Sequence, residues 1–313
     1  MKNIMYVLIA FAMIILAACG DSENGSISES DENDTESTSE QENEEETEEE
    51  STNDKDETIT FGLTSWTSTE APTQIAKQIL EEAGYNVEIS LLEQPLIFEG
   101  MQAEEVDFFM DAWLPYTEAE LWDEYEDDLQ QVATSYEEVP LGWVVPSYVE
   151  DESIEDIKES PEKYDGNVYT IGAGAGIVDI SEEVMTDYNL TDDFELMPSS
   201  ESAMISELDN SIKKEEPVIV TGWRPHSMFA DYDLKFLEEP KENFQYDNVY
   251  VLSYEGIEEK YPEAYEILSD WSIEVSELED MMNQYENEDV PFEESAADWI
   301  EEHRDKVDAM LEE

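Results

Sequence analysis

Apolar and polar residues alternate along most of the chain in a way that predicts mixed helix and strand structure. Residues 58–66 alternate and are rich in β-branched and aromatic types, which is typical of a strand. Residues 71–85 carry apolar side chains at helical spacing and predict a helix. Segments 86–93 and 107–113 again predict strands, with a short helix at 95–106 between them. This order is typical of a parallel α/β sheet, whose ligands lie beyond the carboxyl ends of the strands.

The pattern then continues into a second set of elements. The acidic stretch 119–132 predicts a helix, and 139–149 predicts an extended crossing between two lobes. Several further segments between about residues 147 and 235 repeat the alternation of strand and helix. The remainder, from about residue 249, predicts one strand followed by several helices.

We therefore expect a two-lobed α/β fold with a ligand cleft between the lobes. Lobe 1 would comprise residues 58–145 and 236–313, and lobe 2 would comprise residues 146–235. Two lobes of this kind suit a protein that closes around a small molecule, and closure needs no catalytic group.

Residues 1–19 predict a lipoprotein signal peptide. Lys2 precedes an apolar run at 4–16, and small residues lead to Cys19, the only cysteine of the chain. The run is too short and wrongly flanked to be a spanning helix. Residues 16–19, Leu-Ala-Ala-Cys, resemble the bacterial lipobox, which implies export and a lipid anchor at that cysteine on the outer face of the cytoplasmic membrane. An ordinary signal peptide cut near a chance cysteine is the alternative.

Residues 20–57 predict a disordered acidic linker. They are mostly Glu, Asp, Ser, Thr and Asn. Such a segment cannot bury enough apolar surface to offset the conformational entropy of the chain. It would hold the folded part away from the membrane.

The linker does not explain the net charge of −72. Residues 58–313 alone carry 67 acidic and 11 basic side chains, a net charge of −56. Such a surface argues against nucleic acid as a partner, because binding phosphates requires Lys and Arg. It indicates a protein kept soluble in very salty surroundings, where like-charge repulsion is screened. Long-range attraction of cations is the alternative function of this charge.

Signatures of catalysis and of metal binding are weak. After residue 57 there are two histidines, His226 and His303, and no cysteine. Carboxylate pairs arise by chance in so acidic a chain and do not indicate a glycosidase, and no G-x-S-x-G nucleophile elbow is present. The GAGAGI segment at 172–177 lacks the dinucleotide-binding spacing. It predicts a tight turn whose N–H groups open a helix and can hold a small anion.

Tryptophans give a stronger signal. Four of the seven fall at predicted strand ends or at the lobe crossing, namely Trp66, Trp113, Trp143 and Trp223. The other three lie in predicted helices, where packing is the simpler interpretation, namely Trp122, Trp271 and Trp299. Indole faces attract cations, above all a quaternary ammonium that cannot donate hydrogen bonds. The sequence therefore predicts an aromatic site for such an ion.

Five segments together make the chain similar to a known family. They are GLTSW at 62–66, DAWLPYTEAELW at 111–122, LGWVVPSYV at 141–149, IGAGAGI at 171–177 and TGWRPHSMFADYDLKFLEEP at 221–240. In this order they resemble the OpuAC-type glycine betaine, proline betaine and choline-binding proteins of ABC importers for osmoprotectants. The resemblance runs from about residue 59 to the C-terminus. It implies a two-lobed periplasmic-binding-protein fold of type II, with neither an enzymatic activity nor a cofactor.

The resemblance also implies ligand-binding residues. A cage for a trimethylammonium group would consist of Trp66, Trp113 and Trp223. Trp143 lies near the position where choline-binding relatives place a fourth aromatic residue, and His226 is a further candidate. The backbone N–H groups of two residues at the end of the GAGAGI segment would hold a ligand carboxylate; these are Gly176 and Ile177.

Two positions depart from the family's pattern. Ser227 stands where many relatives have tryptophan. Betaine binders often have a histidine five residues after the DAW tryptophan, and this chain has Glu118 there. An ionised glutamate would repel a carboxylate, so the side chain turns away, or it is protonated in the closed cleft, or the ligand differs. The hydroxyl of choline suits a glutamate, but choline-binding relatives place an aspartate where this chain has Ser68.

The leading hypothesis is a lipid-anchored monomer that captures a quaternary ammonium osmolyte outside the cell and delivers it to an ABC permease. Glycine betaine is the first candidate ligand, and choline and carnitine follow. Two other classes stay open. One is a surface enzyme acting on a choline-containing substrate, which would need a nucleophile or metal near the cage. The other is a sensor or adhesion module displayed by the linker.

Overall fold

The computed structural model describes Lys55 and residues 57–312. The predicted signal peptide with Cys19 lies outside the described residues, as does most of the predicted linker. Within the described ranges, no helix is both long enough and apolar enough to cross a membrane.

The first sheet collects strands from both ends of the described chain. Its strand order is β2-β1-β3-β10-β4. The bounds are β1 Thr58–Leu63, β2 Asn86–Leu91, β3 Phe108–Leu114, β4 Leu129–Val139 and β10 Asp247–Tyr254. Strands β2 and β3 both pair parallel with β1, as the alternation of strand and helix predicts, while β10 lies antiparallel between β3 and β4. The chain therefore returns from the second sheet to complete the first.

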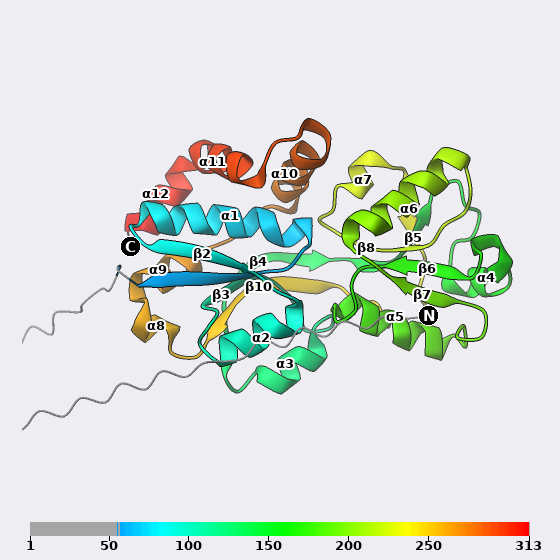
Figure 1. Cartoon of the computed structure of the whole chain (residues 1–313), viewed down its shortest axis with the longest axis horizontal. Helices are drawn as coiled ribbons and strands as arrows, with labels where there is room; N and C mark the ends of the chain where they lie inside the picture. The colour runs from blue at the N-terminus through cyan, green and yellow to red at the C-terminus, as the bar shows by residue number, and fades with distance from the viewer. Residues whose placement is uncertain (1–54, 56, 313) are drawn as a thin grey trace, which may run out of the picture. The chain divides into compact units, whose positions relative to one another are not determined.

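Helices cover both faces of the first sheet (Figure 1). Helix α1, Thr67–Glu82, lies on one face, and α2, Gln94–Gln102, and α3, Ala119–Tyr125, lie on the other. The C-terminal helices are α8 Ile257–Lys260, α9 Pro262–Ser269, α10 Val275–Glu288, α11 Phe292–Glu302 and α12 Arg304–Glu312. Helix α1 packs between the sheet and α11, because an apolar stripe at helical spacing must be buried on one side.

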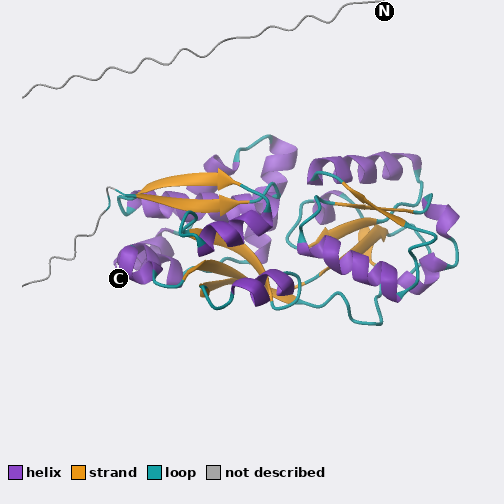
Figure 2. Ribbon diagram, turned by 60° about the horizontal axis from the view of Figure 1, so that its bottom comes forward, coloured by secondary structure: helices purple, strands orange, loops and turns teal. Residues whose placement is uncertain are grey.

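The second sheet is built from the middle of the chain, with strand order β7-β6-β8-β5-β9. The bounds are β5 Leu141–Pro146, β6 Asn167–Thr170, β7 Glu195–Pro198, β8 Val220–Trp223 and β9 Leu234–Phe236. The helices are α4 Ile154–Lys158, the 3₁₀ turn η1 Pro161–Tyr164, α5 Gly176–Asp187, α6 Glu201–Lys214 and α7 Met228–Asp231. Helices α5 and α6 flank opposite faces of this sheet, and Figure 2 shows each sheet between its own helices.

The chain passes from the first sheet to the second at Pro140, between β4 and β5, and returns between β9 and β10. Two predicted lobe boundaries, 145/146 and 235/236, fall within β5 and β9, which both belong to the second sheet. The candidate site lies near the first of these connections, because Trp113 near the end of β3 and Leu141 at the start of β5 both line it.

One predicted element is wrong. The sequence pattern predicts a helix over residues 119–132, but α3 ends at Tyr125 and β4 begins at Leu129. Strand β4 carries polar residues such as Gln130 and Gln131 at successive positions, so no apolar alternation reveals it. It forms because β10, far along the chain, supplies its pairing partner. A long-range interaction therefore overrides the local pattern.

Buried Asp107 contacts two strands of the first sheet and one helix beside it. Its carboxylate accepts hydrogen bonds from the backbone N–H of Thr60 at 2.8 Å and from the hydroxyl of Tyr254 at 3.1 Å. The ammonium group of Lys260 lies 3.2 Å from the same carboxylate. Strand β1, strand β10 and helix α8 are thus held to the start of β3.

We expect Asp107→Ala to lower the free energy of unfolding by about 2 to 3 kcal/mol, because it leaves buried donors without an acceptor. Urea denaturation measures the change. Glu88→Ala, at an exposed position of β2, removes the same charge and should change stability by less than about 0.5 kcal/mol. Equal losses in the two variants would contradict the role given to Asp107.

Candidate functional site

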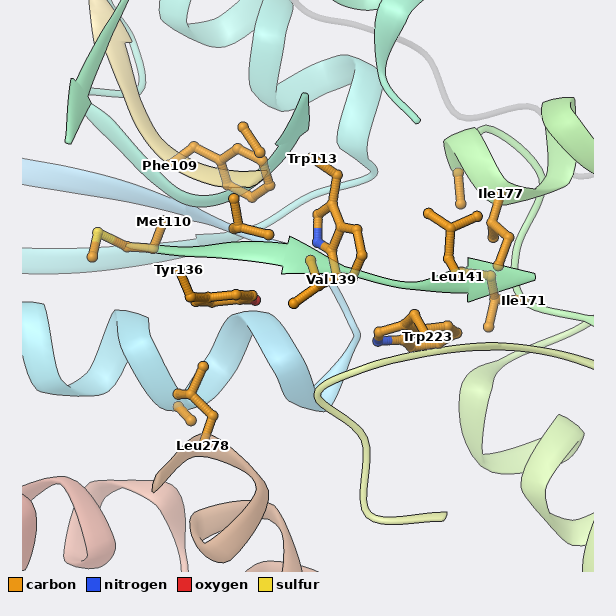
Figure 3. Packing of buried hydrophobic residues seen from close by; sticks show 14 of the residues in the cluster. Phe109, Met110, Trp113, Tyr136, Val139, Leu141, Ile171, Ile177, Trp223 and Leu278 are labelled. Atoms are coloured by element: carbon orange, nitrogen blue, oxygen red, sulfur yellow. The ribbon is translucent and has the colours of Figure 1, made fainter. Parts of the chain in front are cut away.

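One pocket is lined in equal parts by residues associated with the first sheet and residues of the second. The cavity is small, about 40 Å³, which indicates a small group rather than a polymer as its occupant. Trp66, Trp113 and Glu118 line it from the first side, and Ile177 and Trp223 from the second. Figure 3 shows side chains of both sides, including Trp113, Trp223 and Ile177, gathered where β4 passes into β5.

Three of the four predicted cage tryptophans meet at this pocket. Trp66 is half-buried and immediately precedes α1, as its N-cap residue. Trp113 lies near the end of β3, and Trp223 is the last residue of β8. Both are nearly buried, with 6% and 5% of their surface exposed. Indoles from two sheets therefore face one small space.

Buried Asp111 organises the first-sheet side of the pocket. One carboxyl oxygen accepts hydrogen bonds from the indole N–H of Trp113 at 3.1 Å and from the hydroxyl of Tyr136 at 3.0 Å. The other accepts from the hydroxyls of Thr69 at 2.8 Å and Ser68 at 3.3 Å. Burial raises the pKa of Asp111, and these hydrogen bonds oppose that rise. The acid thus fixes one indole and attaches the start of α1, next to Trp66, to strand β3.

A polar contact between Glu201 and Thr67 joins the two sides of the site outside the pocket itself. Glu201, the first residue of α6, accepts hydrogen bonds from the backbone N–H of Thr67 at 3.0 Å and from its hydroxyl at 2.8 Å. His226 Nε2 lies 3.0 Å from Glu201 Oε1, although the ring is not aligned for a hydrogen bond. The imidazole packs edge-on against Trp223, with ring centroids 4.9 Å apart. His226 therefore does not line the pocket but supports a residue that does.

The structure does not bring Trp143 to this pocket. It lies in β5, two residues beyond the pocket residue Leu141, and is fully buried. Its indole N–H donates to the hydroxyl of Ser181 at 3.0 Å, and that hydroxyl donates to the carbonyl of Ile177 at 2.6 Å. Trp143 is thus a core residue that supports the first turn of α5.

The first turn of α5 forms the opposite wall, as the GAGAGI pattern predicts. Gly176 and Ile177 are its first two residues and both line the pocket. The first amides of a helix have no acceptor within the helix, and its dipole favours negative charge there. A Cβ atom on Gly176 would lie only 2.0 Å from the carbonyl oxygen of Thr117, so glycine permits this close approach.

Glu118 lies at the polar end of the pocket and is 2% exposed. One of its oxygens accepts a hydrogen bond from the side-chain amide of Gln94, which also lines the pocket. Its other oxygen, Oε2, has no hydrogen-bond partner among the described residues, and neither has Oε1 of Gln94. Both side chains thus keep a buried polar atom without a hydrogen-bond partner among the described residues.

The environment of Glu118 favours its neutral form. Burial raises the pKa of its carboxyl well above the ordinary value of 4.5, and the nearby carboxyls of Asp111 and Asp247 raise it further. A backbone hydrogen-bond interaction at Trp113 and the hydrogen bond from Gln94 oppose this rise. Asp247 itself accepts from the backbone N–H groups of Tyr116 at 2.8 Å and Thr117 at 3.0 Å, which holds the loop that leads into Glu118.

The pocket contains no cationic side chain. No lysine, arginine or histidine of the described chain lines it. Across residues 57–312, no group of three or more His, Cys, Asp and Glu side chains is arranged to hold a metal ion. Negative groups of a ligand would therefore meet backbone amides and neutral side chains.

Sequence reasoning missed several residues of this site, namely Gln94, Asp111, Thr117 and Glu201. A signal exists for Asp111, because it is the one acid inside a strand whose other residues are all apolar and buried. Gln94 and Glu201 give no such signal, since both stand at helix starts where polar residues are common on any surface. Only the approach of distant segments gives them a role.

Comparisons with known proteins agree with this architecture. Residues 57–302 match the family described as the substrate binding domain of ABC-type glycine betaine transport systems, OpuAC. The glycine betaine/carnitine transport binding protein GbuC of Listeria monocytogenes is 36% identical over 152 residues, which is 48% of this chain and 50% of that protein. The matched region thus spans half the length of that relative.

Two solved structures extend the likeness over most of the described chain. Lactococcal OpuAC, closed and complexed with glycine betaine, is 30% identical with a TM-score of 0.77, covering 82% of this chain and 99% of that one. The glycine betaine/L-proline-binding protein ProX from Borrelia burgdorferi is 28% identical with a TM-score of 0.78, covering 80% and 95%. The predicted two-lobed α/β fold of periplasmic binding proteins is therefore confirmed.

We expect Glu118→Gln to stabilise the ligand-free protein at neutral pH but not at acid pH. A carboxyl with a raised pKa favours the folded state most below its unfolded pKa, near 4.5. This advantage is lost as the pH rises towards the folded pKa, because the unfolded chain releases its proton first. Glutamine has no such proton, so the variant should be more stable by about 1 to 3 kcal/mol at about pH 8. Urea denaturation at several pH values measures it, and a difference that does not vary with pH would contradict the expectation.

Proposed function

This chain belongs to the family of substrate-binding domains of ABC-type glycine betaine transport systems, and on that premise we propose that it captures a quaternary ammonium osmolyte outside the cell and delivers it to an ABC permease. Glycine betaine is the first candidate ligand. Glycine betaine appears in the names or titles of all three relatives described above, and carnitine in that of the Listeria protein. Choline and carnitine follow as alternatives.

The observation that carries this proposal is the meeting of Trp66, Trp113 and Trp223 at one pocket without a cationic side chain. A trimethylammonium group has no N–H to donate, so hydrogen-bond acceptors cannot select it. Indole faces attract it by about 2 kcal/mol or more when the contact is desolvated. The buried Asp111 behind Trp113 keeps negative charge near the cage without competing for contact with the ligand.

The first turn of α5 suits the other end of a betaine. Gly176 and Ile177 line the pocket opposite the first-sheet side, and their N–H groups have no acceptor within their own helix. A carboxylate placed there would meet two donors and the positive end of the helix dipole. Trp143 supports this turn through Ser181 rather than contacting the ligand.

The predicted lipid anchor at Cys19 and the acidic linker complete the proposal. An anchored binding protein stays near its permease and works as a monomer, and the linker gives it reach. The net charge of −72 is consistent with a salty environment, in which compatible solutes are needed.

The two other classes of function have their own requirements. A surface enzyme for choline-containing substrates would need a nucleophile or a metal at the cage. Among the described residues, the only hydroxyls lining the pocket are those of Ser68 and Thr117. Ser68 donates its hydroxyl hydrogen to Asp111. A sensor or adhesion module would not need affinity for small betaines.

Calorimetric titration with glycine betaine, choline, carnitine and proline, at low and high salt, tests the proposed function. We expect binding of at least one trimethylammonium compound and little binding of proline. No binding of any trimethylammonium compound would overturn the proposal.

Trp66→Ala should weaken binding of glycine betaine by about 2 kcal/mol, or roughly 30-fold, because it removes one wall of the cage. Calorimetry measures the change. Trp122→Ala is the matched control, since Trp122 is half-buried on α3 and does not line the pocket. Equal effects of the two substitutions would assign Trp66 to packing.

Gly176→Ala should weaken binding by about 1 to 3 kcal/mol, because the added methyl group collides with the Thr117 carbonyl and keeps the two sides apart. Gly172→Ala is the control from the same glycine-rich turn, since its Cβ atom would meet nothing within 4 Å. If both variants bind like the parent chain, the close approach is not part of the ligand-bound state.

A further inference from the structure

The polar end of the pocket brings a carboxyl, an amide and a helix start together. Glu118 and Gln94 share one hydrogen bond, and each keeps one buried oxygen without a partner among the described residues. Gly176 and Ile177 line the same pocket. A carboxylate bound by the helix start therefore lies near an acid of this chain.

Two ionised carboxylates cannot share this space at low cost. Asp111 shows what a buried acid needs, because four donors surround it. Glu118 has one side-chain donor, the amide of Gln94, and a favourable backbone interaction at Trp113. A charge buried with so few donors is expensive, and a second negative charge from a ligand adds repulsion.

The neighbours of Glu118 offer no cation to relieve this repulsion. Strand β3 contributes Asp111 and strand β10 contributes Asp247, and Tyr136 of β4 also interacts with the carboxyl. The adjoining cavity on the outer side of Glu118 is lined by four further acids, Glu120, Glu124, Asp179 and Glu183. No lysine, arginine or histidine of the described chain lines either cavity.

We propose that Glu118 binds the ligand as a neutral acid, its O–H donating to the carboxylate of a betaine, so that capture is linked to a proton and weakens as the pH rises. This inference rests on the proposed function. Gln94 holds the acid in place by donating to one oxygen, which leaves the other for the O–H that meets the ligand. The proton is not transferred to the ligand, and a free protein in which Glu118 is ionised takes one proton from solution when it binds betaine.

The direction of the pH dependence follows from linkage. A bound carboxylate makes ionisation of Glu118 harder, so the complex holds the proton to a higher pH than the free protein does. By reciprocity, betaine affinity is fully present while Glu118 is protonated in the free protein and falls as the pH rises above that range. The raised pKa of the buried carboxyl brings this transition closer to neutral pH than an ordinary glutamate allows.

The same residue sets the selectivity between two classes of ligand. Choline carries the trimethylammonium group and a hydroxyl but no carboxylate, and its net charge is positive. It therefore gains from an ionised Glu118, which attracts the cation and accepts from the hydroxyl. Betaines should be preferred at low pH, and the preference should shift towards choline as the pH rises.

Calorimetric titrations of the full chain with glycine betaine and with choline, from about pH 5 to about pH 9, test this inference. We expect the betaine affinity to fall by up to about tenfold per pH unit above the pKa of Glu118, while the choline affinity stays constant or rises. Repeating the betaine titration in two buffers of different ionisation enthalpy measures the protons taken up on binding. Net uptake is expected within the range where the affinity changes.

Two substitutions assign the proton to its residue. Glu118→Gln supplies an N–H donor that does not titrate, so its betaine affinity should not vary with pH. Both histidines, His226 and His303, remain in that variant and serve as an internal control. Glu118→Ala lacks any donor and should bind betaine more weakly than the parent chain at about pH 5.

The possible failures are distinguishable. Betaine binding by the parent chain that does not vary with pH would overturn the inference and leave the proposed function standing. So would a pH dependence that survives in Glu118→Gln, or a choline affinity that falls in parallel with that of betaine. Absence of binding by any trimethylammonium compound at every pH would overturn the proposed function itself.

Discussion

The buried carboxyl of Asp111 is the interaction on which the first-sheet half of the pocket depends. It receives hydrogen bonds from the start of α1, from Trp113 two residues along its own strand, and from Tyr136 of β4. Burying an acid without donors would cost free energy, so the buried position of Asp111 depends on these donors. The position of Trp66 follows, because the helix that begins after it is attached to the same acid.

Polar contacts help to hold the second half of the pocket to the first. Glu201 of the second side accepts hydrogen bonds from Thr67, which follows Trp66. His226 lies beside that acid and packs against the indole of Trp223. The carboxylate of Glu201 also lies at the N-terminus of α1, where the helix dipole is positive. A small polar contact of this kind can form and break as two lobes close and open, whereas a large apolar interface could not.

Two buried acids on neighbouring segments have different environments, and the number of donors decides the difference. Asp111 is surrounded by four side-chain donors and serves to position other residues. Glu118 has one side-chain donor, a backbone interaction at Trp113, and an oxygen without a partner among the described residues. Burial raises the pKa of both carboxyls, and it holds that of Glu118 well above its ordinary range. A buried acid that the fold does not satisfy is available to a ligand.

The sequence by itself determined the fold class, the tryptophans at the ends of β3 and β8, and the glycine-rich turn that opens α5, because each depends on local spacing of apolar residues or glycines. Only the tertiary structure decided that 129–139 is a strand, since its partner β10 lies far along the chain. It likewise decided that Trp143 belongs to the core and that Gln94 meets Glu118. Periodicity reports which face of an element is buried, but not which distant residue that face will contact, and the chemistry of this pocket is set by those distant contacts.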